Sequence, residues 1–391
     1  MSRPSLRGEL LVAESMPLEI SRFMQRRSPL SLLIDEVWLR SRRLLTEHMQ
    51  AARLLLPLEV HERTLEEQLS AGHALRSTLL FDCLGSEQYT YLTSEASFGQ
   101  LNARVQKMLP LTLVFGYEVG WGLSHILKLC PGKATAVAEA CSIFNTGVSL
   151  ADVVIDTDPD QRERMIDVLN EHRSGLNPPA SGQEPNIQRQ TSETSVVSGL
   201  AAAFFERLPQ LRGESAPETT LMSWIERARE AEAQSVSDLR ELTPTELLEV
   251  SRTKSVAPVQ VLYHVARSAI DPAADNDDLQ TAEQVVTGLA EAMWLFDDLC
   301  DVLDDLRRGA LNALTVRTVG SHPPGGDPEK ARSILQCLLS TDSLELMIRD
   351  AVAALASAVE PLTATSAAAQ ELRRFNRIVR THAWCWLEYT A

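Results

Sequence analysis

Cysteine, aromatic residues and positive charge are all scarce in this chain. Only 6 of the 391 residues are cysteine, and none forms a CxxC pair. This argues against a disulfide scaffold and predicts reduced cysteines, mostly in the core of a cytoplasmic protein. Lys and Arg number 37 against 53 Asp and Glu, for a net charge of −16. Such an acidic balance argues against a nucleic-acid-binding or basic membrane-surface protein.

The chain also offers no clear membrane span. Its most apolar stretch, residues 109–130, contains Glu118, His125, Lys128 and several glycines. A buried helix pair is therefore predicted there rather than a transmembrane helix. The opening residues, MSRPSLRGELLVAESM, carry no apolar run long enough for a signal peptide.

Helical periodicity dominates, whereas alternating β-branched stretches are rare. We expect a single all-α domain spanning residues 1–391, with 1–29 and the Pro-, Gly- and Ser-rich stretch 174–195 flexible. The sequence predicts helices over 30–56, 58–84, 96–109, 111–129, 134–156, 160–172, 195–208, 217–234, 244–270, 278–307, 328–340, 343–359 and 364–389.

An apolar helix near residue 300 carries a cluster of acids. The sequence WLFDDLCDVLDD contains Asp297, Asp298, Asp301, Asp304 and Asp305. Positions four apart share a helix face, so Asp297 and Asp301 point the same way. A solvated acidic face is the alternative, but the apolar residues around the acids favour burial, and buried carboxylates require cations.

A second cluster ends another apolar helix, in SLADVVIDTDPD. Asp152 and Asp156 share a face there, although an exposed acidic turn would give the same pattern. If the two clusters face each other across a cleft, their oxygens suit Mg²⁺, which usually also binds substrate phosphates. The predicted substrate is therefore a diphosphate.

These motifs resemble those of a known family. FNTGVSLADVVID is similar to the first aspartate-rich helix of the trans-isoprenyl diphosphate synthase superfamily, and WLFDDLCD to the second. TKSVAPV resembles its lysine–threonine motif, Gln234 the glutamine of the preceding helix, and AGHALRS the early basic motif. The resemblance implies the class I terpenoid fold, a single large helical bundle around a central active-site cavity.

The resemblance also implies roles for individual residues. Three Mg²⁺ ions would be held by Asp152, Asp156, Asp297 and Asp301, with Asp298 as a further catalytic carboxylate. The substrate diphosphate would be bound by Arg76, Arg162, Lys254 and Arg308.

The cavity wall is expected to include Asn145, Gly147, Val148 and Trp294. Trp294 could face the allylic cation with its ring, and plain core packing is the alternative. In the family, bulky aromatic residues at the positions of Gly147 and Val148 shorten the accepted chain. Small residues there imply a C15–C25 prenyl diphosphate, with C20 favoured.

Departures from the family pattern suggest the reaction. Bases that would hold a second diphosphate are replaced, by His73, Ala74, Asn145 and Gln161 among others. The loss of several charged hydrogen bonds weakens binding of a dianion. We therefore expect a terpene synthase that cyclises a prenyl cation. The alternatives are a trans-prenyltransferase, with isopentenyl diphosphate or another acceptor, and a non-catalytic subunit of a heteromer. A homodimer is a further expectation.

Overall fold

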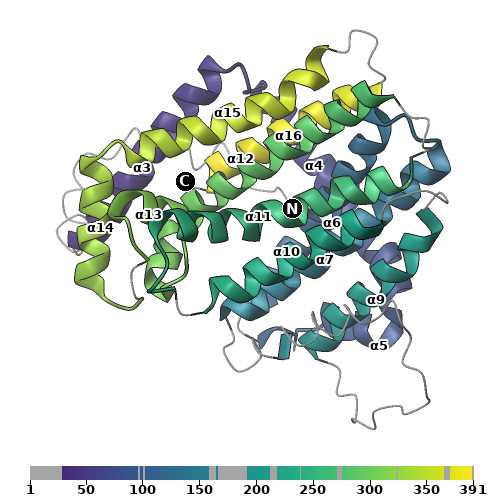
Figure 1. Cartoon of the computed structure of the whole chain (residues 1–391), viewed down its shortest axis with the longest axis horizontal. Helices are drawn as coiled ribbons and strands as arrows, with labels where there is room; N and C mark the ends of the chain where they lie inside the picture. Colours follow the sequence, from purple (N-terminus) through teal and green to yellow (C-terminus); the bar gives the residue numbers. More distant parts are fainter. Residues whose placement is uncertain are drawn as a thin grey trace, which may run out of the picture.

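The computed structural model describes residues 29–95, 97–99, 102–157, 164–165, 192–211, 218–237, 239–270, 275–322, 325–364 and 370–389. All regular structure in these ranges is helical, so the predicted all-α fold is confirmed (Figure 1). The expected flexible segments 1–29 and 174–195 lie outside the described residues, apart from Pro29 and residues 192–195.

The helices are, in chain order, α3 (Pro29–Ala51), α4 (Leu58–Leu75), the π-helical turn η2 (Arg76–Leu80), α5 (Phe81–Thr93), α6 (Asn102–Ile126), α7 (Pro131–Thr157), α9 (Glu193–Leu211), α10 (Glu218–Ser235), α11 (Pro244–Ser268), α12 (Asn276–Arg308), α13 (Ala313–Val319), α14 (Pro328–Ser340), α15 (Ser343–Ala364) and α16 (Gln370–Tyr389). In Figure 1, α11 runs between α10 and α12, and it packs against both.

Local signals fix the ends of the two central helices. Thr243 and Glu246 form a capping box at the start of α11, and Pro244 occupies the first turn, as the sequence predicts. Asp275 caps α12, which ends at Gly309 in the left-handed conformation with Arg307 and Arg308 in the last turn. These caps fix the residues at which α11 and α12 begin and at which α12 ends, directly after the second acid cluster.

Several predicted helix bounds are wrong; for example, the helix expected over 30–56 ends at Ala51. The break expected between 109 and 111 does not occur, because α6 continues through Pro110. The helix expected over 58–84 divides at η2, and α5 is kinked at Gly85, whose φ is 70°. The short helix α13 was not predicted; the buried Asn312 side chain caps it. The helix expected over 160–172 lies outside the described residues, apart from 164–165.

In the described part of the chain, one segment, Pro131–Ile155, is long and apolar enough to cross a membrane. However, 61% of its most apolar window is buried inside the protein. It belongs to α7, the helix that ends in the first acid cluster and packs against α6 and α9. Its apolar character is therefore that of a core helix.

Helices α4 and α6 meet at a glycine. A Cβ added at Gly72 would collide with the backbone carbonyl of Pro110, whereas one added at Gly132 would meet nothing within 4 Å. Gly72→Ala should therefore lower the free energy of unfolding by about 1–3 kcal/mol. Gly132→Ala should be neutral or stabilising by about 0.5 kcal/mol. Urea denaturation measures both, and equal midpoints for the two variants would contradict the close contact.

The C-terminal helix α16 docks on α4 through a buried histidine. His61 Nε2 accepts a hydrogen bond from the Leu56 amide at 3.0 Å, and Nδ1 lies 3.0 Å from Thr381 Oγ1. The Trp384 ring stacks on His61 with centroids 5.0 Å apart. Trp384 therefore helps to dock α16 on α4. Burial, and then Arg380, lowers the pKa of His61 to about 4.

This shift predicts a pH dependence of stability. The folded pKa of His61 lies below the ordinary value of 6.5, so the unfolded chain binds the proton more tightly between pH 6.5 and about 4. Stability from neutral His61 is complete above that window and is lost as the pH falls through it. His61→Gln should reduce the slope of unfolding free energy against pH by up to about 1.4 kcal/mol per pH unit. Unchanged slopes in urea titrations between pH 6.5 and 4.5 would contradict this.

Candidate active site

Acids from three helices, α7, α10 and α12, line one polar cavity of about 460 Å³. Asp152 comes from α7, and Asp297, Asp301 and Asp305 come from α12. Helix α12 is apolar on its other faces, so its acids are held in place by burial of Phe296 and Leu299 beside them. Asp152 of the first predicted cluster and the acids of the second therefore face the same space.

The carboxylates of α12 repel one another. Burial within the protein, and then the charges of Asp301, Asp298 and Asp152, raise the pKa of Asp297 well above its ordinary value. The Asp297 side chain is nevertheless exposed, because it points into the cavity. Burial also raises the pKa of Asp305 to about 7, although a hydrogen bond from Asn312 lowers it in part. A bound cation would relieve this repulsion.

Lys254 is a central base of the cavity. Its Nζ lies 2.9 Å from Asp152 Oδ1 and 3.4 Å from Glu232 Oε1. The ammonium group thus joins α7, α10 and α11 at the polar cavity. Because an ammonium is a compact point charge with three donors, it also suits a phosphate oxygen.

Asp298 faces a different set of partners. Its Oδ2 accepts hydrogen bonds from Ser251 Oγ at 2.8 Å and from the Ala313 amide at 2.7 Å. Asn312 Nδ2 donates to the Asp298 carbonyl and to Asp305 Oδ2. Burial raises the pKa of Asp298 to about 6, against the hydrogen bonds that lower it. Although Asp298 also lines the cavity, this geometry makes it a positioning residue that ties α11 and α13 to α12.

The structure does not place Trp294 in the cavity wall. Its ring is buried, its Nε1 donates to Ser251 Oγ at 2.8 Å, and the guanidinium of Arg317 lies 5.8 Å from its centroid. Trp294 lines neither the polar cavity nor the smaller apolar cavity that adjoins it. The alternative of core packing fits this position, because the indole N–H has a partner and the ring face already meets a cation.

The predicted bases are dispersed. Arg308 lines the polar cavity and pairs with Asp305 at 3.0 Å. Arg76 does not line it in the described part of the chain; its guanidinium instead donates to Gln106 Oε1 at 2.6 Å. Arg162 lies outside the described residues, and of Asp156 only the helical backbone is described.

Other lining residues were missed in the sequence. Arg104 of α6 lines the polar cavity. Burial raises the pKa of Asp301, and the charge of Arg104 partly offsets this rise. Glu232 of α10 also lines the polar cavity, whereas Gln234, two residues later, is exposed. His322 completes one wall. No local pattern marks these three lining residues; only the helix packing brings them to the site.

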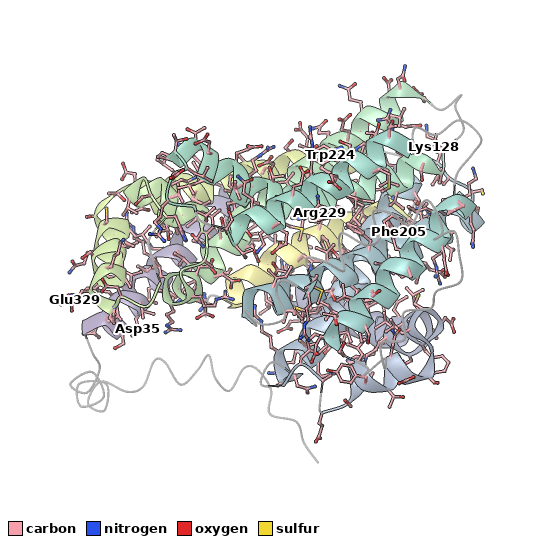
Figure 2. The ribbon with its side chains drawn as sticks, turned by 60° about the horizontal axis from the view of Figure 1, so that its bottom comes forward. Asp35, Lys128, Phe205, Trp224, Arg229 and Glu329 are labelled. Carbon is pink, nitrogen blue, oxygen red and sulfur yellow. The ribbon has the colours of Figure 1, made fainter. Side chains whose placement is uncertain are left out.

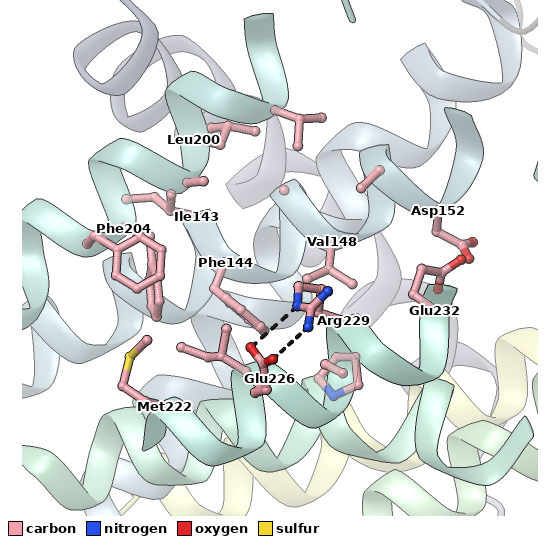
Figure 3. A pocket seen from close by; sticks show the side chains of 18 of the residues that line it. Ile143, Phe144, Val148, Asp152, Leu200, Phe204, Met222, Glu226, Arg229 and Glu232 are labelled. Atoms are coloured by element: carbon pink, nitrogen blue, oxygen red, sulfur yellow. Dashed lines mark hydrogen bonds and ion pairs between the residues drawn. The ribbon is translucent and has the colours of Figure 1, made fainter. Parts of the chain in front are cut away.

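An apolar cavity of about 110 Å³ adjoins the polar one and shares Val148, Asp152, Glu232 and Lys254 with it. Its wall comes from α7, α9, α10 and α11, and Figure 2 shows Arg229 of α10 and Phe205 of α9 on this side of the molecule. Gly147 and Val148 line the apolar cavity, and Figure 3 shows Val148 in its wall. Asn145 lines the polar cavity, where its Nδ2 donates to the Thr112 carbonyl at 2.8 Å.

The donor set suits Mg²⁺ held partly by other ligands. Among the residues that the structure describes, no three acids, histidines or cysteines are close enough to hold a metal ion by themselves. Mg²⁺ usually binds one or two carboxylates and completes its shell with water and phosphate. Asp152, Asp297 and Asp301 offer such carboxylates around a polar cavity large enough for a diphosphate, and the repulsion at Asp297 favours a cation.

Comparison with solved structures identifies the fold. The decaprenyl diphosphate synthase from Rhodobacter capsulatus aligns over 85% of this chain and 99% of its own, with TM-score 0.53 and 15% identity. The geranylgeranyl pyrophosphate synthetase from Pyrococcus horikoshii Ot3 aligns over 82% and 98%, with TM-score 0.54 and 15% identity. The geranylgeranyl pyrophosphate synthase from Corynebacterium glutamicum aligns over 88% of this chain and 98% of its own, with TM-score 0.53 and 14% identity.

No family model matches the chain, and no curated protein sequence matches it. The chain nevertheless shares the fold of these solved prenyl diphosphate synthases, which is the fold that the aspartate-rich motifs predict. At 14–15% identity the likeness is one of fold.

Metal binding can be tested without turnover. Asp297→Asn should stabilise the metal-free protein, because it removes one of the mutually repelling charges. Mg²⁺ at about 100 times its dissociation constant should stabilise the wild type by about 2.7 kcal/mol and the variant by much less. Asp304→Asn, at an exposed position paired with Arg307, is the matched control and should keep the Mg²⁺ effect. Equal Mg²⁺ effects in thermal unfolding of all three proteins would contradict the assignment of Asp297.

Proposed function

We propose that this protein is a Mg²⁺-dependent enzyme that ionises an allylic prenyl diphosphate. The observation that carries the proposal is the junction of the two cavities. One is lined by carboxylates from α7 and α12 together with Lys254, and the other is apolar and begins at the same Asp152. This arrangement matches a molecule with a diphosphate head and a hydrocarbon tail.

The residues of the site have separate tasks. Asp152, Asp297 and Asp301 would hold the metal ions, and Asp156 is proposed with them. When bound, Mg²⁺ supplies electrostatic stabilisation of the departing diphosphate. Lys254, with Arg104 and Arg308 at the cavity wall, would donate to diphosphate oxygens as negative charge develops on them.

The apolar cavity would enclose the hydrocarbon. Phe144 of α7 and Phe204 of α9 lie in its wall with ring centroids 5.0 Å apart, and Leu200 lies beside them. These side chains would exclude water from the allylic cation, which otherwise would be captured as an alcohol. Asp298 would act indirectly, by keeping α11, α12 and α13 in register.

Prenyl transfer to a second substrate is the better supported fate of the cation, because the solved enzymes that share the fold are prenyl diphosphate synthases. Cyclisation without a second diphosphate is the other candidate. Its support is that Arg76 is bound to Gln106, while the neighbouring His73 and Ala74 are exposed. The predicted homodimer stays a prediction.

Product analysis separates the candidates. The protein is incubated with Mg²⁺ and geranyl, farnesyl or geranylgeranyl diphosphate, each with and without isopentenyl diphosphate. Longer prenyl diphosphates formed only with isopentenyl diphosphate identify a transferase, whereas hydrocarbon or terpene alcohol from one substrate identifies a cyclase. No conversion in any arm contradicts the proposal and favours a non-catalytic subunit.

Substitution of one carboxylate tests the site. Asp297→Ala should lower kcat by about 10²-fold or more, because it removes a group that stabilises the leaving diphosphate through the metal. Asp304→Ala, on the same helix but exposed, should keep nearly full activity. Circular dichroism confirms that both variants fold, and comparable activity of the two would mean that the metal ligands are elsewhere.

A further inference from the structure

The apolar cavity runs between two helices that point the same way. Along α10, Met222, Glu226, Arg229 and Glu232 all line it, at spacings of four, three and three residues that keep them on one helix face. Along α7, Phe144, Val148 and Asp152 do the same at spacings of four. Asp152 and Glu232 mark one end, where both approach Lys254. Phe204 and Met222 mark the other (Figure 3).

An ion pair interrupts this apolar space. Arg229 Nη2 lies 2.6 Å from Glu226 Oε1, and its Nε donates to Glu226 Oε2 at 3.3 Å. The two side chains are only 17% and 26% exposed. Figure 3 shows the pair between the end marked by Asp152 and Glu232 and the end marked by Phe204 and Met222.

The pair therefore stands partway along the path of a bound chain. Val148 lies one helical turn from Asp152, which is about 6 Å along α7, and the Arg229 side chain lies beside Val148 in Figure 3. Half-buried charges that already satisfy each other gain nothing from contact with hydrocarbon, and separating them costs the attraction between them. Extending an apolar chain beyond the ion pair is therefore energetically unfavourable.

The room expected at Gly147 does not extend the pocket. A Cβ placed on Gly147 would lie 3.6 Å from the Leu200 Cβ of α9, which is ordinary packing distance. The absence of a side chain at Gly147 is thus largely compensated by a residue from another helix. The size of the cavity thus depends on α9 and α10 as well as on α7.

We propose that the Glu226–Arg229 ion pair limits the length of the prenyl chain, so that the site takes a C10 or C15 diphosphate in preference to C20. This inference rests on the proposed function and replaces the C20 preference that the small residues of α7 suggest. It makes Glu226 and Arg229 specificity-determining residues that touch the tail and not the diphosphate.

Binding measurements test the limit apart from catalysis. The unreactive thiolodiphosphate analogues of geranyl, farnesyl and geranylgeranyl diphosphate are titrated calorimetrically in the presence of Mg²⁺. The wild type should bind the farnesyl analogue about tenfold or more tightly than the geranylgeranyl analogue. The double variant Glu226→Met, Arg229→Met removes both charges together, so no unpaired charge is left behind. It should lose this preference or reverse it.

The matched control is Arg227→Met, a charge removed from an exposed position of the same helix that lines neither cavity and contacts the Trp224 ring. It should bind all three analogues as the wild type does. Tighter or equal binding of the geranylgeranyl analogue by the wild type overturns the proposal without any variant. An unchanged preference in a folded double variant also overturns it.

Turnover of the corresponding diphosphates is scored separately. Selective binding of the farnesyl analogue with no turnover of any substrate would refute the proposed reaction and leave the length limit standing. Turnover of geranylgeranyl diphosphate with kcat/KM equal to that of farnesyl diphosphate would do the opposite. Failure to bind any of the three analogues would overturn both.

Discussion

The site depends on the contact between one lysine and two carboxylates from different helices. Lys254 lies within ion-pair distance of Asp152 and Glu232, so one ammonium group holds the functional ends of α7, α10 and α11 together. Without it, the acids of α7 and α10 would lose the cation that offsets their repulsion, whereas Arg104 and Arg308 would still balance acids of α12. The same group stands where the polar and apolar cavities join, so its position also sets where a diphosphate head would end and a tail begin.

A second set of contacts keeps α12 in register. Trp294, Ser251 and Asp298 form a chain of hydrogen bonds that reaches the first amide of α13. Asn312 closes the set by bonding both to the backbone of α12 and to Asp305. Buried polar groups of this kind are costly unless every partner is present. In the sequence, Trp294 and Asp298 resemble catalytic groups. In the structure, their hydrogen bonds hold α12, which carries Asp297 and Asp301, in position against α11 and α13.

The apolar cavity is shorter than the small residues of the α7 motif alone suggest. Gly147 and Val148 precede Asp152 by about one turn, and their small size suggests a long pocket. In the folded chain, Leu200 of α9 packs at Gly147, and the ion pair of α10 lies beside Val148 (Figure 3). Four helices, α7, α9, α10 and α11, together bound the space available to a ligand, and no single helix specifies it.

The sequence by itself determined the all-α class, most helix positions and the two acid clusters. These follow from local rules, because the apolar period of a helix and the four-residue spacing of Asp297 and Asp301 need no distant partner. Only the tertiary structure decided that Arg76 binds Gln106, that Arg104 and Glu232 line the cavity, and that Trp294 lies in the core. Each of those outcomes depends on which side chains of other helices lie nearby, and that information is spread over residues tens to hundreds of positions apart.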